Sequence, residues 1–261
     1  MWRPVPSGSI NLRMQEIDFH RRLFRPGTLI DVGAHDGGLT LPLAELPGAR
    51  VLAFEPLPEA FGRLQAAFRD RYGGTVPAHV ELSNEALGEA DGRIVLEVPV
   101  VGGVAQQQWA SVVKDYEAIR AADPRIEAVQ RLDVKQRTLD GLGLTDVTAI
   151  KIDVEGAEEE VLRGARATLL RCRPILSIEI EERHRSGSLH AVPAFLTGMG
   201  YRGFYEFWGE WWPIEAFDPA QMQRGSASPA AFEVSDPYVF CFYFLPEKRV
   251  AELAQLARLP R

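Results

Sequence analysis

Cysteine is scarce in this chain: Cys172 and Cys241 are its only two cysteines among 261 residues. They lie far apart in the sequence. A single pair of this kind is more often two reduced thiols than a disulfide framework. We therefore expect both cysteines to be buried or half-buried free thiols.

Long apolar runs and an excess of basic residues are also missing. The longest apolar run, YVFCFYFL at 238–245, is far too short to span a bilayer, and the first thirteen residues lack the apolar segment of a secretory leader. The net charge is −7, which argues against nucleic acid or an anionic membrane as the main partner. We expect a cytoplasmic protein whose partner is a small molecule.

Short apolar segments alternate with amphipathic ones along most of the chain, within what we expect to be a single domain, 1–261. This alternation predicts βαβ units and an α/β fold with a mostly parallel sheet covered on both faces. In such sheets, ligands bind at the carboxyl ends of the strands. The expected strands are 28–32, 50–56, 78–84, 146–156 and 174–182, and the expected helices are 12–24, 58–72, 157–171 and 189–200.

Three segments stand outside this alternation: an N-terminal lead helix within 1–27, an insertion at 93–137, and an aromatic-rich insertion or cap at 201–236. Eight of the seventeen residues at 201–217 are aromatic. They could stack on a sugar, cover the sheet or form a homodimer contact, and packing is favoured. The aromatic candidates are Tyr205, Trp208, Trp211 and Trp212, and the candidates for a substrate lid in the insertion are Gln106, Gln107, Gln108, Trp109 and Ser111.

The junction after the first strand reads LIDVGAHDGG at 29–38. Glycines let the backbone turn sharply and approach a ligand, and the helix that follows offers unpaired N–H groups to an anion. The second strand ends at Glu55, 24 residues after Asp31, where an acid can accept hydrogen bonds from a ribose diol. Together these features indicate an adenosine-containing cofactor.

Two such cofactors compete. A nicotinamide site usually has the spacing G-x-G-x-x-G, which Gly33, Gly37 and Gly38 do not satisfy. An acid placed before the first glycine, as Asp31 is, suits a cationic amine instead. S-adenosylmethionine carries an ammonium, a carboxylate and a ribose, which Asp31, the helix N-terminus and Glu55 would match. His35 in the same turn suits a backbone with positive φ, because histidine is one of the non-glycine residues enriched there.

Six segments resemble the FkbM family of S-adenosylmethionine-dependent methyltransferases in order and spacing. The most specific is KIDVEGAEEEVLRGA at 151–165; the others are DVGAHDG at 31–37, AFEPLPEAF at 53–61, SNEALGEADG at 83–92, RTLDGL at 137–142 and PILSIEIEE at 174–182. The resemblance implies the class I methyltransferase (Rossmann-like) fold, a doubly wound sheet of seven strands with one antiparallel strand near the C-terminus. It also implies O-methylation of a small hydroxylated acceptor, such as a sugar, a glycan or a natural product.

Carried over by position, the resemblance also implies cofactor contacts. The turn after the first strand would hold the methionine end, the second strand would end at the ribose, and Asp153 would lie by the sulfonium. The family usually has asparagine at the position of His35. The cofactor-binding residues expected in this way are Asp31, Gly33, Ala34, His35, Gly37, Glu55, Pro56, Asn84, Glu85 and Asp153.

The catalytic candidates are Asp153, Glu155 and Glu179, which lie at strand ends. They could assist deprotonation of the acceptor or hold a divalent cation such as Mg²⁺, and independence of metal is favoured because no histidine joins them by motif. Glu181 is a weaker candidate, and His184 is interpreted as a surface histidine. Two other functions stay open: a nicotinamide-dependent oxidoreductase, and a binding protein of methyltransferase fold without activity.

Overall fold

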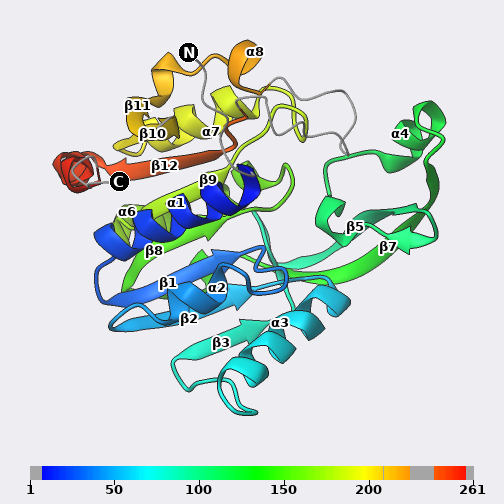
Figure 1. The fold of residues 1–261 in the computed structure, drawn as a ribbon, viewed down its shortest axis with the longest axis horizontal. Coiled ribbons are helices and arrows are strands. Elements are labelled where there is room, and N and C mark those ends of the chain that lie inside the picture. The colour runs from blue at the N-terminus through cyan, green and yellow to red at the C-terminus, as the bar shows by residue number, and fades with distance from the viewer. Residues whose placement is uncertain (1–7, 208, 224–237, 257–261) are drawn as a thin grey trace.

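A central sheet of eight strands organises the computed structural model, which describes residues 8–207, 209–223 and 238–256 (Figure 1). Five strands run parallel, and β12 lies antiparallel between β9 and β10. The order across the sheet is β3 (Val80–Ser83), β2 (Ala49–Phe54), β1 (Gly27–Val32), β8 (Val147–Ile152), β9 (Ile175–Glu179), β12 (Cys241–Pro246), β10 (Tyr201–Phe207) and β11 (Glu210–Pro213). The α/β fold with a mostly parallel sheet is confirmed.

The sheet has one strand more than the seven expected. Strand β11 folds back on β10 as an antiparallel hairpin, so a second strand runs against its neighbour. Gly209 has a φ of 82°, a value that glycine adopts without strain in a tight reversal. Trp211 of this strand then packs on Tyr243 of β12, with ring centroids 4.9 Å apart. The hairpin therefore covers the end of the sheet with an aromatic side chain.

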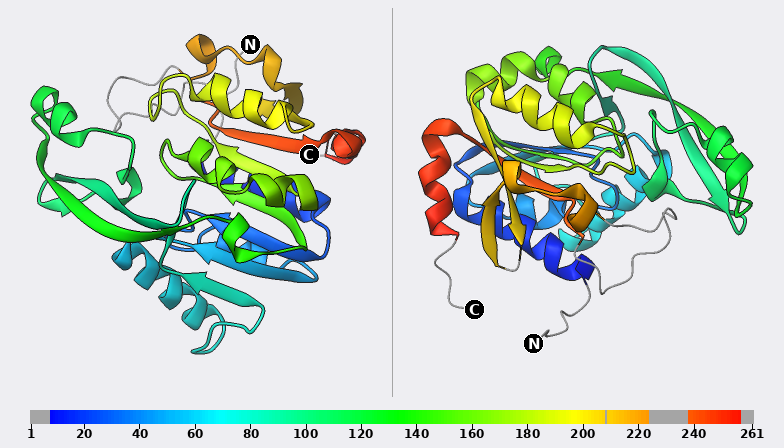
Figure 2. Two further views of the ribbon diagram at one scale, coloured as in Figure 1. Left: turned by 180° about the vertical axis from the view of Figure 1, so that it is seen from behind. Right: turned by 90° about the horizontal axis from the view of Figure 1, so that it is seen from above.

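Helices cover both faces of the sheet (Figures 1 and 2). On one face lie α1 (Gly8–Leu23), α2 (Thr40–Ala44) and α3 (Pro58–Arg71); on the other lie α5 (Glu158–Arg163), α6 (Arg166–Cys172) and α7 (Ser188–Thr197). The single helix expected at 157–171 is two short helices that meet at Gly164. A Cβ at Gly164 would lie 1.9 Å from the carbonyl oxygen of Gly88, so this glycine lets the two chain segments touch.

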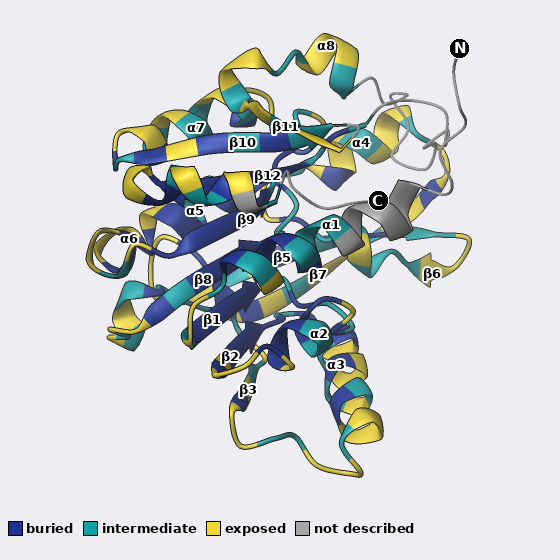
Figure 3. Ribbon diagram, turned by 60° about the vertical axis from the view of Figure 1, so that its left-hand side comes forward, coloured by how far each residue is buried: buried dark blue, intermediate teal, exposed yellow. Residues whose placement is uncertain are grey.

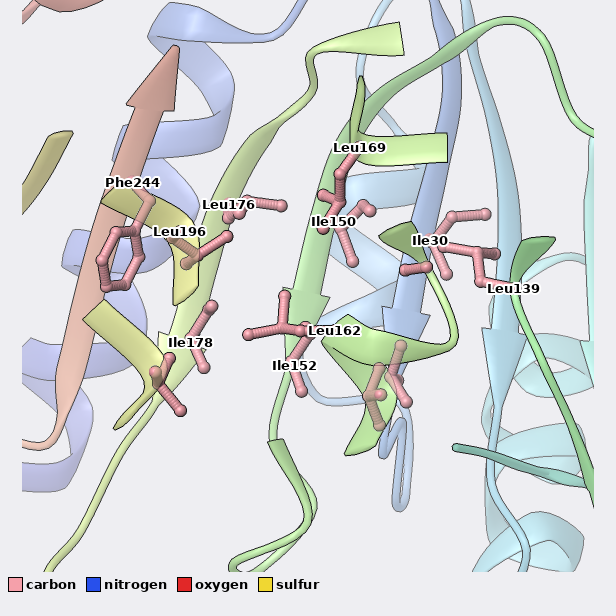
Figure 4. Packing of buried hydrophobic residues seen from close by; sticks show 14 of the residues in the cluster. Ile30, Leu139, Ile150, Ile152, Leu162, Leu169, Leu176, Ile178, Leu196 and Phe244 are labelled. Atoms are coloured by element: carbon pink, nitrogen blue, oxygen red, sulfur yellow. The ribbon is translucent and has the colours of Figure 1, made fainter. Parts of the chain in front are cut away.

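Buried apolar side chains fill both interfaces between the sheet and its helices. Successive strand residues point to opposite faces, so Leu29 joins the cluster of α1 to α3 and Ile30 joins the cluster of α5 to α7. In Figure 4, Leu162 lies beside Ile152 of β8 in the second cluster. The inner strands β1, β2, β8, β9 and β12 are accordingly mostly dark blue in Figure 3, where colour marks burial.

The insertion expected at 93–137 forms most of a second, smaller sheet of four strands. Its long strands β5 (Gly92–Val101) and β7 (Ile126–Arg137) pair antiparallel, while β4 (Ala86–Leu87) and β6 (Val104–Ala105) lie at its edges. Short helices η1 (Gln107–Trp109) and α4 (Tyr116–Ala122) connect the strands. A small apolar core joins this sheet to the start of α3: Leu57, Ala60, Ala86, Leu96, Val98 and Val134.

The aromatic-rich segment packs into the fold. Tyr205 is buried, and Trp211 contacts Phe19 of α1 as well as Tyr243. The packing interpretation is therefore confirmed for these two residues, whereas Trp212 is exposed and Trp208 lies outside the described residues. The segment continues through η3 (Ile214–Ala216) and α8 (Pro219–Met222), and the rest of the span expected up to 236 is not described.

Both cysteines are free thiols, Cys241 buried and Cys172 half-buried. Short helices η2 (Asp140–Leu142) and η4 (Glu247–Gln255) complete the described elements. Within residues 8–207, 209–223 and 238–256, no helix has both the length and the apolar character needed to cross a membrane.

Candidate functional site

A cavity of about 270 Å³ lies at the carboxyl ends of β1, β2, β8 and β9, between the main sheet and the small sheet. Apolar walls come from both sheets, and acidic side chains stand at the strand ends. The predicted site residues that line it are Gly33, His35, Glu55, Pro56, Glu85, Asp153, Glu155 and Glu179. Gln107, Gln108, Ala110 and Val112 of the insertion close its outer side.

The turn after β1 has the backbone that its sequence predicts. Gly33, His35 and Gly37 have φ values of 80°, 50° and 85°, so the conformational interpretation of His35 is confirmed. A Cβ on Gly33 would lie 1.8 Å from the carbonyl oxygen of Asp153. The turn after β1 and the turn after β8 therefore touch, and only glycine fits between them. Ala34 and Gly37 are not among the residues that line the cavity.

Glu55 ties the turn after β1 to the start of α3. Its Oε2 accepts a hydrogen bond of 2.8 Å from the backbone N–H of His35, and its Oε1 accepts one of 2.9 Å from that of Leu57. Burial raises the pKa of this carboxyl, which is 4% exposed. Each carboxylate oxygen has a further lone pair for a ligand in the cavity.

Asn84 supports the same corner from outside the cavity. Its side-chain amide donates to the carbonyl oxygens of Glu55 at 2.8 Å and Pro56 at 3.0 Å. Asn84 was expected to bind the cofactor, but it is not among the residues that line the cavity, whereas its neighbour Glu85 is.

Asp31 lies below the site in a buried charge cluster. It is fully buried, and its Oδ2 accepts a 2.6 Å hydrogen bond from the hydroxyl of Thr40. Its Oδ1 lies 3.3 Å from the ammonium of Lys151, which also lies 3.6 Å from Asp153. Burial acts to lower the pKa of Lys151, but the charges of Asp31 and Asp153 outweigh it and hold that pKa above its ordinary value.

Three acids meet at the other end of the cavity. Asp153, Glu155 and Glu179 each offer a carboxylate oxygen within 4.8 Å of the other two. Burial raises the pKa of Glu155 to about 7, although the nearby Lys114 ammonium acts in the opposite direction. Burial and the charge of Asp153 likewise raise the pKa of Glu179 well above its ordinary value. Glu155 therefore has the proton affinity expected of a group that accepts a proton near neutral pH.

Glu155 stands between two basic side chains. The ammonium of Lys114 donates to its Oε2 at 2.8 Å, and Nε2 of His184 lies 3.1 Å from the same oxygen. The interpretation of His184 as a surface histidine is wrong, because the residue is 8% exposed and sits between Glu155 and Glu181. Burial lowers its pKa to about 3. Glu181 bonds to Arg183 and does not line the cavity.

Residues 31–202 match the family model of the Methyltransferase FkbM domain, which therefore covers more than half of the chain. The chain belongs to the FkbM methyltransferase family.

Individual relatives are distant in sequence. The 2-O-methyltransferase NoeI of Sinorhizobium fredii is 26% identical over 195 residues, which cover 70% of this chain and 75% of that protein. Methyltransferase 1 of Beauveria bassiana is 31% identical over 147 residues, 52% of this chain and 57% of that protein. The crystal structure of Methyltransferase FkbM from Methylobacillus flagellatus superposes with a TM-score of 0.52 at 19% identity; the match covers 84% of this chain but 43% of that one.

Within the FkbM fold of this chain, sequence reasoning missed the two lysines that hold the site. Lys151 is the first residue of the segment KIDVEG, two positions before Asp153, and its place on the strand puts both side chains on the same face of the sheet. That alternation was a signal for Lys151. No comparable signal marks Lys114, because it lies in the insertion and meets Glu155 only through the tertiary fold.

Proposed function

We propose that this chain is an S-adenosylmethionine-dependent O-methyltransferase that acts on a hydroxyl of a small acceptor, such as a sugar, a glycan or a natural product. One observation carries the proposal: a single cavity is lined by Glu55 and the glycine turn on one side and by three acids on the other, Asp153, Glu155 and Glu179, whose carboxylate oxygens lie within 4.8 Å of one another. Family membership supports methyl transfer rather than the hydride transfer of a nicotinamide enzyme.

The residues of the cavity fit this cofactor. Glu55 presents carboxylate lone pairs to which the hydroxyls of a ribose diol would donate, and the apolar side chains of Leu57, Leu87 and Leu96 give the adenine a wall without charge. Asp153 lies against the turn that would hold the methionine end, so its carboxylate would face the cationic groups. Asp31 would act through Lys151 and Thr40, because its carboxylate is enclosed by them.

Bound S-adenosylmethionine supplies a methyl group already activated by positive sulfur. The protein then has to orient an acceptor oxygen about 3–3.5 Å from that carbon and remove its proton. We assign proton removal to Glu155 and Glu179, since both line the cavity and both have raised pKa values. The proton would move from the acceptor hydroxyl to a carboxylate oxygen as the carbon–oxygen bond forms and the carbon–sulfur bond breaks, with S-adenosylhomocysteine as the leaving group.

A divalent cation is not needed for this scheme. A positive charge already lies 2.8 Å from Glu155 Oε2, namely the ammonium of Lys114, so a cation shared by the three acids would be repelled by it. The same carboxylates have the oxygen chemistry that Mg²⁺ prefers, which makes removal of metal an informative experiment.

The acceptor class rests on the outer wall of the cavity. Gln107 and Gln108 line this wall with side-chain amides. The amide of Gln107 already bonds to Arg63 and Glu59, and that of Gln108 donates to Gln106, so each amide has one further hydrogen or lone pair for a polyhydroxylated ligand. The relative from Sinorhizobium fredii carries the name 2-O-methyltransferase, which agrees with an oxygen nucleophile.

Calorimetry with S-adenosylmethionine and S-adenosylhomocysteine is the first test, followed by transfer of a labelled methyl group to a panel of free sugars, glycosides and hydroxylated natural products. We expect binding and label on oxygen. Tight binding of NADH without binding of S-adenosylmethionine would contradict the proposal. Cofactor binding without transfer to any acceptor would favour the inactive binding protein.

A further inference from the structure

The insertion contacts the turn after β8 at Glu155. The hydroxyl of Ser111 donates to the backbone carbonyl of Glu155 at 2.9 Å, and the ammonium of Lys114 donates to its side chain at 2.8 Å. Ser111 also accepts hydrogen bonds from the backbone N–H groups of Val113 and Lys114. One short segment, 111–114, thus donates hydrogen bonds to both the backbone carbonyl and the carboxylate of a residue that lines the cavity.

Lys114 is itself held in place. Its side chain is 12% exposed, and its ammonium lies 6.0 Å from the ring centre of the buried Tyr116, whose hydroxyl donates to the carbonyl of Trp109. A lysine fixed by an aromatic ring and a carboxylate loses the freedom of an exposed chain. Its ammonium therefore defines where the carboxylate of Glu155 stands.

Glu155 needs such support. Its φ is 54°, a left-handed backbone that glutamate rarely adopts and that persists only where the surroundings fix it. On the other side, Nε2 of His184 lies 3.1 Å from the oxygen that Lys114 binds. The titratable and charged groups around this site are Lys114 and Tyr116 from the insertion, Asp153 and Glu158 from the turn after β8 and the start of α5, and Glu179, Glu181, Arg183 and His184 from the segment at and after β9.

We infer that Lys114 is a positioning residue for methyl transfer: it holds the carboxylate of Glu155 toward the acceptor, so the insertion completes the catalytic end of the site. This inference rests on the proposed function, and it goes beyond it by giving the insertion a part in the reaction. The inference assigns cofactor binding and the positioning of Glu155 to different parts of the chain. The cofactor end of the cavity is built by Glu55 and the turn after β1, and the hydrogen bond of Lys114 goes to Glu155 instead.

The test compares Lys114→Met, which keeps the chain length but removes the charge and the donors, with Lys114→Arg, which keeps both. Lys135→Met, an exposed lysine of the same sheet, is the matched control. We expect Lys114→Met to lower kcat by about 10- to 100-fold, the effect of misplacing a reacting group by about 1 Å. The dissociation constant of S-adenosylhomocysteine should stay within about twofold of wild type, Lys114→Arg should recover most of kcat, and the control should match wild type.

Wild-type kcat in a folded Lys114→Met variant would overturn the inference. So would a parallel loss of cofactor binding and melting temperature, because that pattern means a purely structural role. If Lys114→Met does not fold, Lys114→Gln takes its place with the same expected split. Crystal structures of wild type and the methionine variant give a readout without any substrate: the Glu155 carboxylate should move in the variant, and an unmoved carboxylate refutes the inference. The failure of wild type to bind S-adenosylmethionine would instead count against the proposed function.

Discussion

The ammonium of Lys151 donates a 2.8 Å hydrogen bond to the carbonyl oxygen of Gly33. The same ammonium lies 3.3 Å from the buried carboxylate of Asp31. One lysine thus neutralises an acid inside the sheet and fixes the first residue of the turn that borders the cavity. Stability and cofactor binding are therefore coupled at this point.

Lys151→Met should destabilise the protein by about 3–5 kcal/mol, because it leaves Asp31 buried without a cation. Urea unfolding measures the loss, with Lys135→Met as the exposed control. A change below about 1 kcal/mol would show that Asp31 is neutral or solvated in the folded chain.

Gly33→Ala should abolish cofactor binding and lower the melting temperature, since its Cβ would lie 1.8 Å from the Asp153 carbonyl oxygen. Gly73→Ala is the matched control: Gly73 has a φ of 68°, and nothing lies within 4 Å of the added carbon. The control carries only backbone strain, about 1–2 kcal/mol. Equal effects of the two substitutions in calorimetry and thermal unfolding would refute the contact between the turns.

Glu55→Ala should weaken binding of S-adenosylhomocysteine by about 1.5–3 kcal/mol, the range for hydrogen bonds to a charged group. It should also reduce stability, because the N–H groups of His35 and Leu57 lose their acceptor. Glu55→Gln keeps one side-chain oxygen, so its affinity and its stability should lie between those of wild type and Glu55→Ala. Calorimetry that gives the same dissociation constant for all three proteins would remove Glu55 from the cofactor site.

Asp153→Asn and Glu155→Gln should separate the two ends of the cavity. We expect the first to lower mainly cofactor affinity and the second to lower kcat by about 10²–10⁴, the usual range for general acid–base catalysis. Steady-state kinetics with calorimetry distinguishes them, and a reversed pattern contradicts the assignment. Activity should persist in EDTA; loss restored by Mg²⁺ or Mn²⁺ would establish a metal site at these acids.

His20→Gln should reduce the sensitivity of the fold to acid. Burial lowers the pKa of His20 from 6.5 to about 3, so between these values the unfolded chain binds a proton that the folded chain does not. Wild type therefore loses up to about 1.4 kcal/mol per pH unit as the pH falls through this window. Gln can retain the contact that His20 makes with Ser177 at 2.8 Å. The free energy of unfolding of wild type minus that of the variant should be smaller at pH 5 than at pH 7. The same difference at both pH values would mean that His20 titrates normally.

The sequence predicted the parts of this protein that depend on local pattern. Short apolar segments between amphipathic ones located the five parallel strands, and the residue preferences of a left-handed backbone accounted for His35. Eight of the twelve residues expected at the cofactor or catalytic ends line one cavity; the other four, Asp31, Ala34, Gly37 and Asn84, do not.

The features of the site that the sequence did not predict depend on contacts between segments that are distant in the chain. Lys114 and His184 are 70 positions apart, yet both lie beside Glu155. Nothing near His184 in the sequence distinguishes a buried histidine from an exposed one. Asp31 was expected to face the ligand, but its exposure depends on Lys151 and Thr40, which enclose it only in the folded sheet.

The position of β12 has a consequence for the order in which the chain can assemble. This strand follows all the other described strands in sequence, yet it lies inside the sheet between β9 and β10. During synthesis, β9 and β10 emerge before β12, the strand that pairs with both of them. Until β12 is made, the edge of each strand that faces it exposes unpaired backbone groups. The nascent chain can complete the parallel half early, but it cannot close the other half until residue 246 is available. A chaperone that shields exposed strand edges would therefore act at this late stage, and a ribosome stalled before residue 241 would hold an open, aggregation-prone sheet.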